Sequence, residues 1–150
     1  MISISHMLWF DDNAEEAANF YTSLVPNSKM GHISRNGDGN AFTVEFEIAG
    51  NKYVGLNGGP VFTFNESFSI VITCDGQEDV DHYWNALIAD GGSEGRCGWL
   101  KDKFGLSWQV VPVQLMQCLG NPDPERVQRA MSAMTQMNKL IVAELEAAVA

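Results

Sequence analysis

Gln109 is a polar residue in the middle of a short hydrophobic strand. It belongs to the stretch GWLKDKFGLSWQVVP, residues 98–112, in which Asp102 and Gly105 mark a tight turn between two predicted strands. An amide side chain can exchange hydrogen bonds with a bound molecule, or offer its oxygen to a metal ion. A glutamine that only faces solvent is the simpler alternative, and the residues that share its face decide between these interpretations.

Aromatic and cationic side chains stand near Gln109 in the same hairpin. Trp99 and Lys101 share one face of the preceding strand, because alternate residues of a strand point the same way. An aromatic surface beside one cation could hold a planar polar ligand, although core packing is the commoner role of a lone tryptophan. Trp9 alternates with Leu8 and Phe10, so it faces away from the helix side of its strand. It is either a pocket residue or a packing residue at a sheet or dimer interface.

The other histidines and the cysteines lack the spacing of a metal or nucleophilic site. His32 and His82 have no partner at ligand spacing, and we expect both at the surface. The cysteines lie in apolar stretches with no C-x-x-C pair: Cys74, Cys97 and Cys118. Such cysteines are usually buried free thiols, so a structural zinc site is not predicted.

Composition and charge narrow the classes of function. The chain of 150 residues is 45% hydrophobic, as a folded domain is, and its net charge of −10 opposes binding to nucleic acid. That charge is compatible with neutral or cationic small molecules, although an acidic surface is more often a solubility feature. The N-terminus is not a signal peptide, and nothing approaches the ~20 apolar residues of a membrane span. We expect a cytoplasmic protein with a small-molecule ligand and neither a nucleic-acid nor a membrane partner.

The sequence contains a pattern that occurs twice. When Tyr21 is placed on Trp84, each copy reads as a strand followed by an amphipathic helix with aromatic residues at matching positions. Each copy also begins with D-x-x-E, the signature of a helix N-cap: Asp12 with Glu15, and Asp75 with Glu78. Any two amphipathic helices could match in part, but the paired caps and paired aromatics favour an internal duplication.

Strands and turns complete two β-α-β-β-β units. In the first, the strand over residues 2–10 and its helix are followed by strands over 29–35, 41–48 and 52–57, which turn at NGDGN and AGN. In the second, the predicted strands cover 68–74, 96–101 and 106–111, with a short stub at Ser93 and Glu94. Beyond Pro112 the chain is predicted to be helical, with Pro124 at a helix start. The expected organisation is a single domain over 1–150, made of one unit at about 2–57, another at about 67–111 and a helical tail over 112–150.

The tandem units and three longer stretches resemble a known superfamily. The stretches LWFDDNAEEAANFYTSLVPNSK, LNGGPVFTFNESFSIVITCDGQEDVDHYW and CGWLKDKFGLSWQVVP are similar to the PhnB-like branch of the vicinal oxygen chelate superfamily, which includes glyoxalases, bleomycin-resistance proteins and dioxygenases. That branch often carries the name 3-demethylubiquinone-9 3-methyltransferase. The resemblance implies an α+β fold in which the two units form a cupped eight-stranded mixed sheet, usually in a homodimer. It implies the fold more firmly than an activity.

The methyltransferase name implies S-adenosylmethionine, whose usual site needs a glycine-rich turn between a parallel strand and a helix. The glycine clusters stand elsewhere: Gly37 and Gly39 in a hairpin, Gly58 and Gly59 in a linker, Gly91 and Gly92 at a helix end. The sequence does not support a conventional site for that cofactor, and no cofactor is predicted.

The resemblance also implies a role for Gln109. In metal-dependent relatives, four ligands come from the first and last strands of the two units, and here these positions are Gln109, Asn57, Ser69 and either His6 or Ser5. The repeat offset selects His6, whereas a one-residue bulge at Asp11 and Asp12 would select Ser5. Amides and a hydroxyl without a carboxylate hold Zn²⁺, Ni²⁺ or Fe²⁺ weakly, so we predict a pocket without a metal.

Two functions of different classes remain open from the sequence. One is a metal-independent enzyme that acts on a small metabolite polarised by Gln109, Asn57 and Ser69, with His6 as the one histidine that could move a proton there. The other is a binding protein that sequesters a small molecule such as a cationic drug, as bleomycin-resistance proteins do. The candidate pocket residues are His6, Trp9, Asn57, Ser69, Trp99, Lys101 and Gln109.

Overall fold

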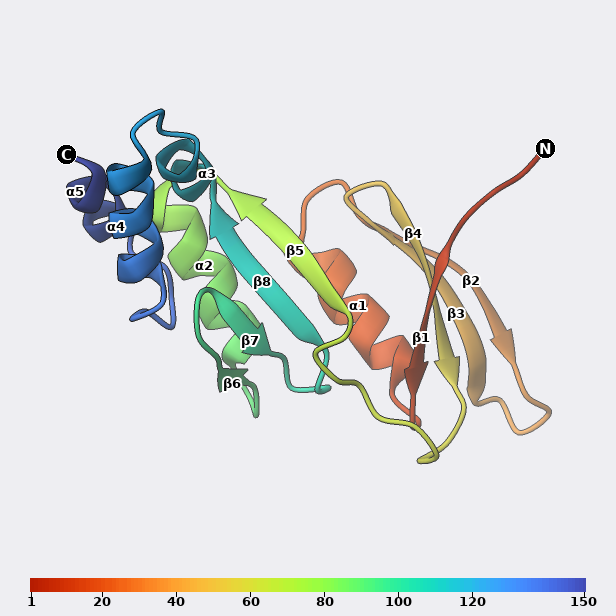
Figure 1. Cartoon of the computed structure of the whole chain (residues 1–150). Coiled ribbons are helices and arrows are strands. Elements are labelled where there is room, and N and C mark those ends of the chain that lie inside the picture. Colours follow the sequence, from red (N-terminus) through yellow and green to blue (C-terminus); the bar gives the residue numbers. More distant parts are fainter. The chain divides into compact units, whose positions relative to one another are not determined.

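Each half of the chain folds as one β-α-β-β-β unit. The computed structural model describes residues 1–150, and the chain divides into two compact units, Met1–Phe64 and Asn65–Ala150 (Figure 1). Both units contain a four-stranded mixed sheet. The predicted α+β fold and its internal duplication are therefore confirmed.

The first unit consists of β1 (His6–Phe10), α1 (Ala14–Leu24), β2 (Lys29–Arg35), β3 (Ala41–Ile48) and β4 (Asn51–Asn57). Its strand order is β1-β4-β3-β2, with β1 parallel to β4 and the other neighbours antiparallel. The prediction placed the first strand over residues 2–10, but β1 begins only at His6. Ile2 and Ile4 are exposed and have no strand partner.

The second unit repeats this topology with β5 (Ser69–Cys74), α2 (Gly76–Ile88), β6 (Ser93–Glu94), β7 (Trp99–Lys101) and β8 (Ser107–Pro112). Its strand order, β5-β8-β7-β6, matches that of the first unit, and its outer pair, β5 and β8, is again parallel. The weak stub predicted at Ser93 and Glu94 is the short strand β6.

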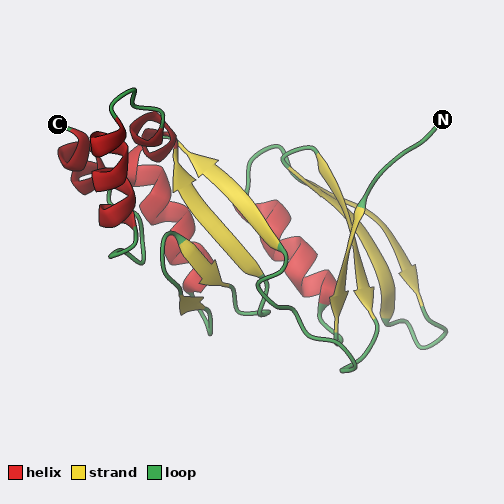
Figure 2. Cartoon of the chain, in the orientation of Figure 1, coloured by secondary structure: helices red, strands yellow, loops and turns green.

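One helix covers one face of each sheet (Figure 2). Tyr21 of α1 and Trp84 of α2, the two residues matched in the repeat, are both fully buried against their own sheets. Small residues of α1, among them Ala14, Ala17 and Ala18, are buried as well, because they let the helix approach the sheet closely. The opposite face of each sheet is the one that α1 or α2 does not cover, and we term it the helix-free face.

The predicted caps are only partly right. The N-cap of α1 is Asn13 rather than Asp12, and the Asn13 side chain makes no capping hydrogen bond. Asp75 is the N-cap of α2 as predicted, but it is Asp79, not Glu78, that accepts a hydrogen bond from the Asp75 backbone N–H, at 3.3 Å. Three residues separate β1 from α1, whereas only Asp75 separates β5 from α2, so the first unit has two more residues in this connection.

The helical tail belongs to the second unit. It contains α3 (Val113–Leu119), α4 (Pro124–Met134) and α5 (Val142–Val149), and Pro124 begins α4 as predicted, after Asp123. These helices and the end of β8 share one hydrophobic core: Val111, Leu115, Cys118, Ala130, Met137, Leu140 and Leu145. No helix of the structure has the length and apolar character that crossing a membrane requires.

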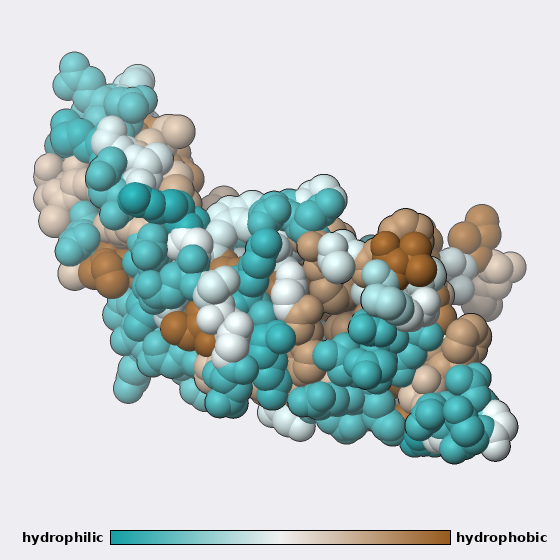
Figure 3. Space-filling view, turned by 90° about the horizontal axis from the view of Figure 1, so that it is seen from below, coloured by the Kyte–Doolittle hydropathy of each residue, from teal (hydrophilic) through white to brown (hydrophobic).

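The face of the molecule shown in Figure 3 is mainly hydrophilic, with separate hydrophobic patches. The exposed large hydrophobic side chains include Ile2, Ile4, Met7, Phe62 and Val71. The hydrophilic character agrees with the net charge of −10.

Candidate functional site

Four of the predicted pocket residues share the helix-free face of the second unit. In β8, Trp108 and Val110 are fully buried on the side of α2, so the alternate residues Ser107 and Gln109 point to the other face. Trp99 of β7 is the direct partner of Gln109 across the sheet. The remaining two positions, Lys101 and Ser69, both pair with Ser107.

Gln109 and Ser69 are joined by a hydrogen bond. The Gln109 amide Nε2 donates to Ser69 Oγ at 3.1 Å, and both side chains are half-buried. The Gln109 carbonyl oxygen has no partner in the chain, and the Ser69 hydroxyl can donate onward. The pair therefore offers one acceptor and one donor to a molecule on this face.

A cavity of about 240 Å³ opens beside these residues. It is lined by Glu66, Ser93, Glu94, Gly95, Trp99, Leu100, Lys101 and Ser107. Lys101 Nζ lies 2.5 Å from Glu66 Oε1, and the hydrogen bond from Lys101 lowers the pKa of the Glu66 carboxyl. The cavity thus combines the aromatic side chain of Trp99 with an ion pair, whereas the Glu94 carboxylate turns to the α2 side, where it accepts a hydrogen bond from Trp84 Nε1 at 3.0 Å.

The turn between β7 and β8 holds this face in register. Asp102 is buried, and its Oδ1 accepts hydrogen bonds from the backbone N–H groups of Phe104 at 2.9 Å and Leu106 at 3.0 Å. Its Oδ2 accepts from Trp108 Nε1 at 2.9 Å. The expectation that Asp102 is committed to the turn is confirmed, and the bonds fix the residues on either side of Ser107.

The sequence-based prediction did not include Ser107. Its side chain is only 1% exposed, and its hydroxyl has no hydrogen-bond partner in the chain. Strand alternation with Gln109 places it on the same face, so the pattern that identified Gln109 could also have identified Ser107. Glu94 carries no such signal, because β6 is too short for its pattern to be read.

The predicted residues of the first unit are not brought into a comparable group. Trp9 lies on the helix-free face of its own sheet, where its Nε1 donates to the Gly59 carbonyl at 2.9 Å and its ring meets Phe62 edge-on, 4.9 Å between centroids. The segment after β4 therefore covers Trp9. This contact resembles packing more than an open binding surface.

Asn57 uses its whole amide within the fold. Its Oδ1 accepts a hydrogen bond from the Ala14 N–H at 2.9 Å, and its Nδ2 donates to the Ala41 carbonyl at 3.0 Å. It lines a polar cavity of about 430 Å³ with Asp11, Asp12 and Arg35 among others, but its polar atoms are already occupied. The residue ties the start of α1 to the start of β3.

The structure places Ser5 and His6 on different sides of the chain. His6 shares the α1 side with the buried Leu8 and Phe10, and its ring lies 5.6 Å from that of Tyr53. Ser5, the alternative that a one-residue bulge would select, lines a cavity of about 340 Å³ that His6 does not line. Of the two alternatives for the first strand, Ser5 and not His6 therefore lines this cavity of the first unit.

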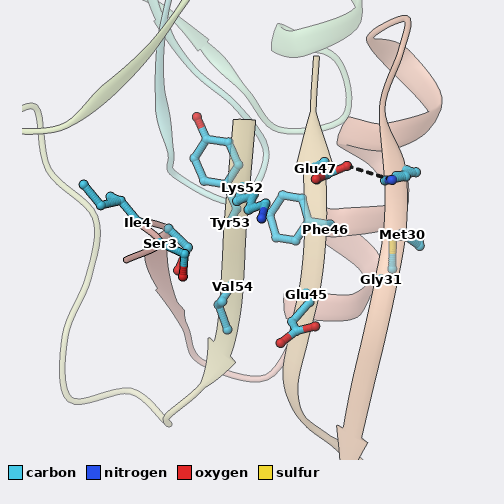
Figure 4. Close-up of a pocket in the computed structure, with 12 residues that line it drawn as sticks. Ser3, Ile4, Met30, Gly31, Glu45, Phe46, Glu47, Lys52, Tyr53 and Val54 are labelled. Atoms are coloured by element: carbon cyan, nitrogen blue, oxygen red, sulfur yellow. Dashed lines mark ion pairs between the residues drawn. The ribbon is translucent and has the colours of Figure 1, made fainter. Parts of the chain in front are cut away.

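This cavity of about 340 Å³ lies on the helix-free face of the first unit (Figure 4). Lys29 and Glu47, direct partners on β2 and β3, form an ion pair at 3.2 Å among its lining residues, and Glu45, Lys52 and Val54 add charge and an apolar side chain. It contains none of the seven predicted residues.

A family model described as 3-demethylubiquinone-9 3-methyltransferase matches residues 2–111. The chain belongs to this family. The PhnB protein of Bacillus cereus, a solved structure named as a 3-demethylubiquinone-9 3-methyltransferase, is 30% identical with a TM-score of 0.68, and the match covers 74% of this chain and 99% of that one. No curated protein matches the sequence.

More distant solved structures share the fold. A protein from Pseudomonas aeruginosa is 17% identical with a TM-score of 0.61, and the match covers 75% of this chain and 98% of that one. The fosfomycin resistance protein FosX of Listeria monocytogenes, in complex with Mn(II) and 1S,2S-dihydroxypropylphosphonic acid, is 21% identical with a TM-score of 0.53, and the match covers 73% of this chain and 92% of that one. This chain, a member of the PhnB-like family, therefore has the fold of the vicinal oxygen chelate superfamily.

The residues of this chain do not fit a divalent metal of the kind that FosX holds. No group of three or more His, Cys, Asp or Glu side chains is placed to hold one. Gln109 and Ser69 are neutral and already bonded to each other, whereas such ions prefer imidazole or carboxylate ligands. The glycine clusters likewise lie in the β2–β3 hairpin, after β4 and after α2, so none forms the turn that S-adenosylmethionine would need.

Proposed function

We propose that this PhnB-like protein binds a small metabolite on the helix-free face of its second unit, without the help of a metal. The observation that carries the proposal is the group formed by Gln109, Ser69, Trp99 and Lys101 beside a cavity of about 240 Å³. The amide oxygen and the hydroxyl bind polar groups of the ligand, and the indole of Trp99 packs against its apolar part. A cavity of this size suits a ligand at the small end of the usual range.

A thermal-shift screen of small metabolites tests the proposal. A ligand present at ~100 times its dissociation constant should stabilise the protein by about 2.7 kcal/mol. The same ligand should bind Gln109→Ala at least tenfold more weakly, because one good hydrogen bond and its geometry are lost. Gln117→Ala, an exposed amide of α3, is the matched control and should keep the affinity. A ligand that binds Gln109→Ala as tightly as the wild type would contradict the proposed site.

The metal-independence of the site is tested separately. Elemental analysis of dialysed protein should find no stoichiometric Zn²⁺, Ni²⁺, Fe²⁺ or Mn²⁺, and one equivalent per chain would contradict the proposal. The double variant Gln109→Glu with Ser69→His places a carboxylate and an imidazole at the two bonded positions. Metal affinity gained by this variant would show that the geometry is retained and only the ligand types are missing.

We also propose that the protein acts in the cytoplasm as a homodimer. Strand edges at β1 and β5 and exposed side chains such as Met7, 60% exposed, and Val71, 53% exposed, favour coverage by a second copy. Sedimentation at micromolar concentration should show twice the chain mass. A stable monomer under those conditions would count against the dimer and leave the binding site untouched.

A further inference from the structure

Ser107 has the one buried side-chain polar atom without a hydrogen-bond partner in the chain. The residue is 1% exposed and lines the cavity of about 240 Å³ in the second unit. Buried hydroxyls are almost always paired, because leaving one unpaired loses the hydrogen bonds that it makes in water. The Ser107 hydroxyl therefore has bonding capacity that a molecule entering this cavity can use.

Lys101 lies beside Ser107 on the helix-free face. The two residues are direct partners on β7 and β8, and such partners have their Cβ atoms about 5 Å apart. Ser69 of β5 pairs with Ser107 from the other side. This end of the face thus holds two hydroxyls and one ammonium.

The ammonium of Lys101 already holds a carboxylate, because its Nζ lies 2.5 Å from Glu66 Oε1. The two partners differ in how firmly their backbones are held. Lys101 belongs to β7, whereas Glu66 lies in a turn of the linker before β5, and its side chain is 62% exposed. Exposed ion pairs contribute little to stability. Glu66 is thus the partner that can leave, because its release disturbs no strand.

Trp99 supplies an aromatic surface next to these polar groups. It stands two residues before Lys101 in β7, so both side chains point to the same face, with their Cα atoms about 6.6 Å apart. Its side chain is half-buried and lines the same cavity. A molecule with an anionic end and a flat aromatic end matches the order of these side chains along the strand.

We propose that this cavity is a site for a small aromatic carboxylate. The inference rests on the proposed function and names the ligand class of that same site. The carboxylate of the ligand replaces that of Glu66 on Lys101 and accepts a second hydrogen bond from the Ser107 hydroxyl, while its ring packs on Trp99. The Glu66 side chain then turns out into solvent. This displacement lowers the affinity by about fivefold at most, since an exposed ion pair is weak.

Compounds of matched shape test the charge requirement by calorimetry. They are phenylacetate and 3-phenylpropanoate, the amide of each, and 2-phenylethylamine. We expect each carboxylate to bind at least about tenfold more tightly than its amide, because charge-assisted hydrogen bonds are stronger than neutral ones. The amine should bind more weakly than either amide. An amide or an amine that binds as tightly as the carboxylates would overturn the inference.

Lys101→Met keeps the length of the side chain and removes the ammonium, so the preference for carboxylate over amide should fall to about twofold or less. Lys29→Met is the matched control, because Lys29 forms an exposed ion pair with Glu47 in the first unit at 3.2 Å. Both variants make the net charge of −10 more negative by the same amount, so general repulsion of anions is equal in the two. A preference that survives in Lys101→Met, or is lost equally in Lys29→Met, would overturn the assignment.

Glu66→Gln removes the competing carboxylate. Phenylacetate should therefore bind this variant about two- to fivefold more tightly than the wild type. Glu47→Gln removes the same charge from the ion pair of the first unit and should leave the affinity unchanged. Equal or weaker binding to Glu66→Gln would contradict the inference that Glu66 occupies the place of the ligand.

Ser107→Ala separates a role in binding from a role in folding. Phenylacetate should bind this variant several-fold more weakly. The midpoint of urea unfolding should not fall, because the hydroxyl has no partner in the chain to lose. An unchanged affinity for phenylacetate would exclude Ser107 from the site.

The outcome for this ligand class is separable from that for the proposed function. If the carboxylates fail to bind while the metabolite screen finds a neutral ligand sensitive to Gln109→Ala, the carboxylate inference is wrong and the proposed function stands. If neither the screen nor these compounds give a ligand that depends on Gln109, Lys101 or Ser107, the proposed function is wrong and the inference falls with it.

Discussion

At the scale of single residues, Asp102 carries the largest identifiable role in the second unit. One buried carboxylate accepts hydrogen bonds from two backbone N–H groups and from the indole of Trp108. Asp102→Ala leaves all three donors without that acceptor, and bonds to charged groups are worth about 1.5–3 kcal/mol each when measured singly. We expect a loss of about 3 kcal/mol or more in the free energy of unfolding, measured in urea.

Asp12→Ala is the matched control for Asp102→Ala. Asp12 is exposed and has no hydrogen bond of its own, in contrast to the cap role predicted from D-x-x-E. Its replacement should change the free energy of unfolding by about 0.5 kcal/mol or less. Equal losses in the two variants would show that the turn does not depend on the carboxylate.

The three cysteines should differ in reactivity. Burial raises the pKa of the Cys74 thiol to about 11, with a smaller contribution from Asp79, and burial also raises the pKa of Cys118. Since the thiolate is the reactive form, both should react slowly at pH 8, and labelling of Cys74 should accelerate only as the pH approaches 11. Cys97 is the least buried of the three.

The measurement is the rate of labelling with a chromogenic disulfide reagent. One thiol should react rapidly in the folded protein, all three in denaturant, and Cys97→Ser should abolish the rapid phase. Two rapid thiols in the native protein would contradict the burial of Cys74 or Cys118. Because the raised pKa favours the folded state only while the thiol stays protonated, stability should be full below about pH 8.5 and decline as the pH rises toward 11.

At the scale of elements, Asn57 replaces the missing cap of α1. No side chain caps the helix from its own N-terminal turn, and the Ala14 N–H is satisfied by Asn57 Oδ1 from β4. Asn57→Ala should therefore destabilise the protein by about 1–2 kcal/mol, as the loss of a cap does. Asn57→Asp keeps the acceptor for Ala14 and loses only the donor to Ala41, so its loss should be smaller. If urea denaturation gave Asn57→Asp a lower free energy of unfolding than Asn57→Ala, this role would be contradicted.

The strands were more predictable than the contacts that join them. β2 and β3 have the predicted bounds, because the NGDGN turn and strict alternation specify both ends. The register of β1 was left open between Ser5 and His6, since an extra residue between strand and helix cannot be seen in a periodic pattern. Asn57 was assigned to a pocket because its real partner cannot be read from the sequence. The Ala14 N–H that it accepts from lies 43 residues away and is close only in the folded chain.

The candidate site was predictable to the extent that it depends on the alternation of side chains between the two faces of a strand. Trp99, Lys101 and Gln109 lie in one hairpin, so their common face follows from the sequence, and Ser69 follows from the parallel pairing of β5 with β8. Glu94 and Glu66 come from a two-residue strand and from a linker, where no period exists to assign a face. Their place in the cavity requires the folded structure.

At the scale of the whole molecule, the helical tail is an integral part of the second unit. Residues 113–150 lie outside the family match, which ends at residue 111, yet they share a core with β8 and bond to α2 through Gln77. Leu140 is fully buried, and a methyl group at Gly98 would lie 3.0 Å from its side chain. The tail thus packs directly on the loop that precedes Trp99.

This packing predicts that the tail and the second sheet unfold together. Leu140→Ala should lower the free energy of unfolding by about 2.7–5 kcal/mol, because it creates a cavity where the surrounding side chains cannot collapse fully. Trp84, Trp99 and Trp108 are three of the 4 tryptophans, so fluorescence reports mainly on the second unit. The fluorescence transition in urea should therefore shift with the loss of helical circular dichroism. Met116→Ala, at a side chain that is 60% exposed in α3, should shift neither signal by more than about 0.5 kcal/mol. If Leu140→Ala moved only the circular dichroism and left the fluorescence transition in place, the tail would be an independent module that does not stabilise the second sheet.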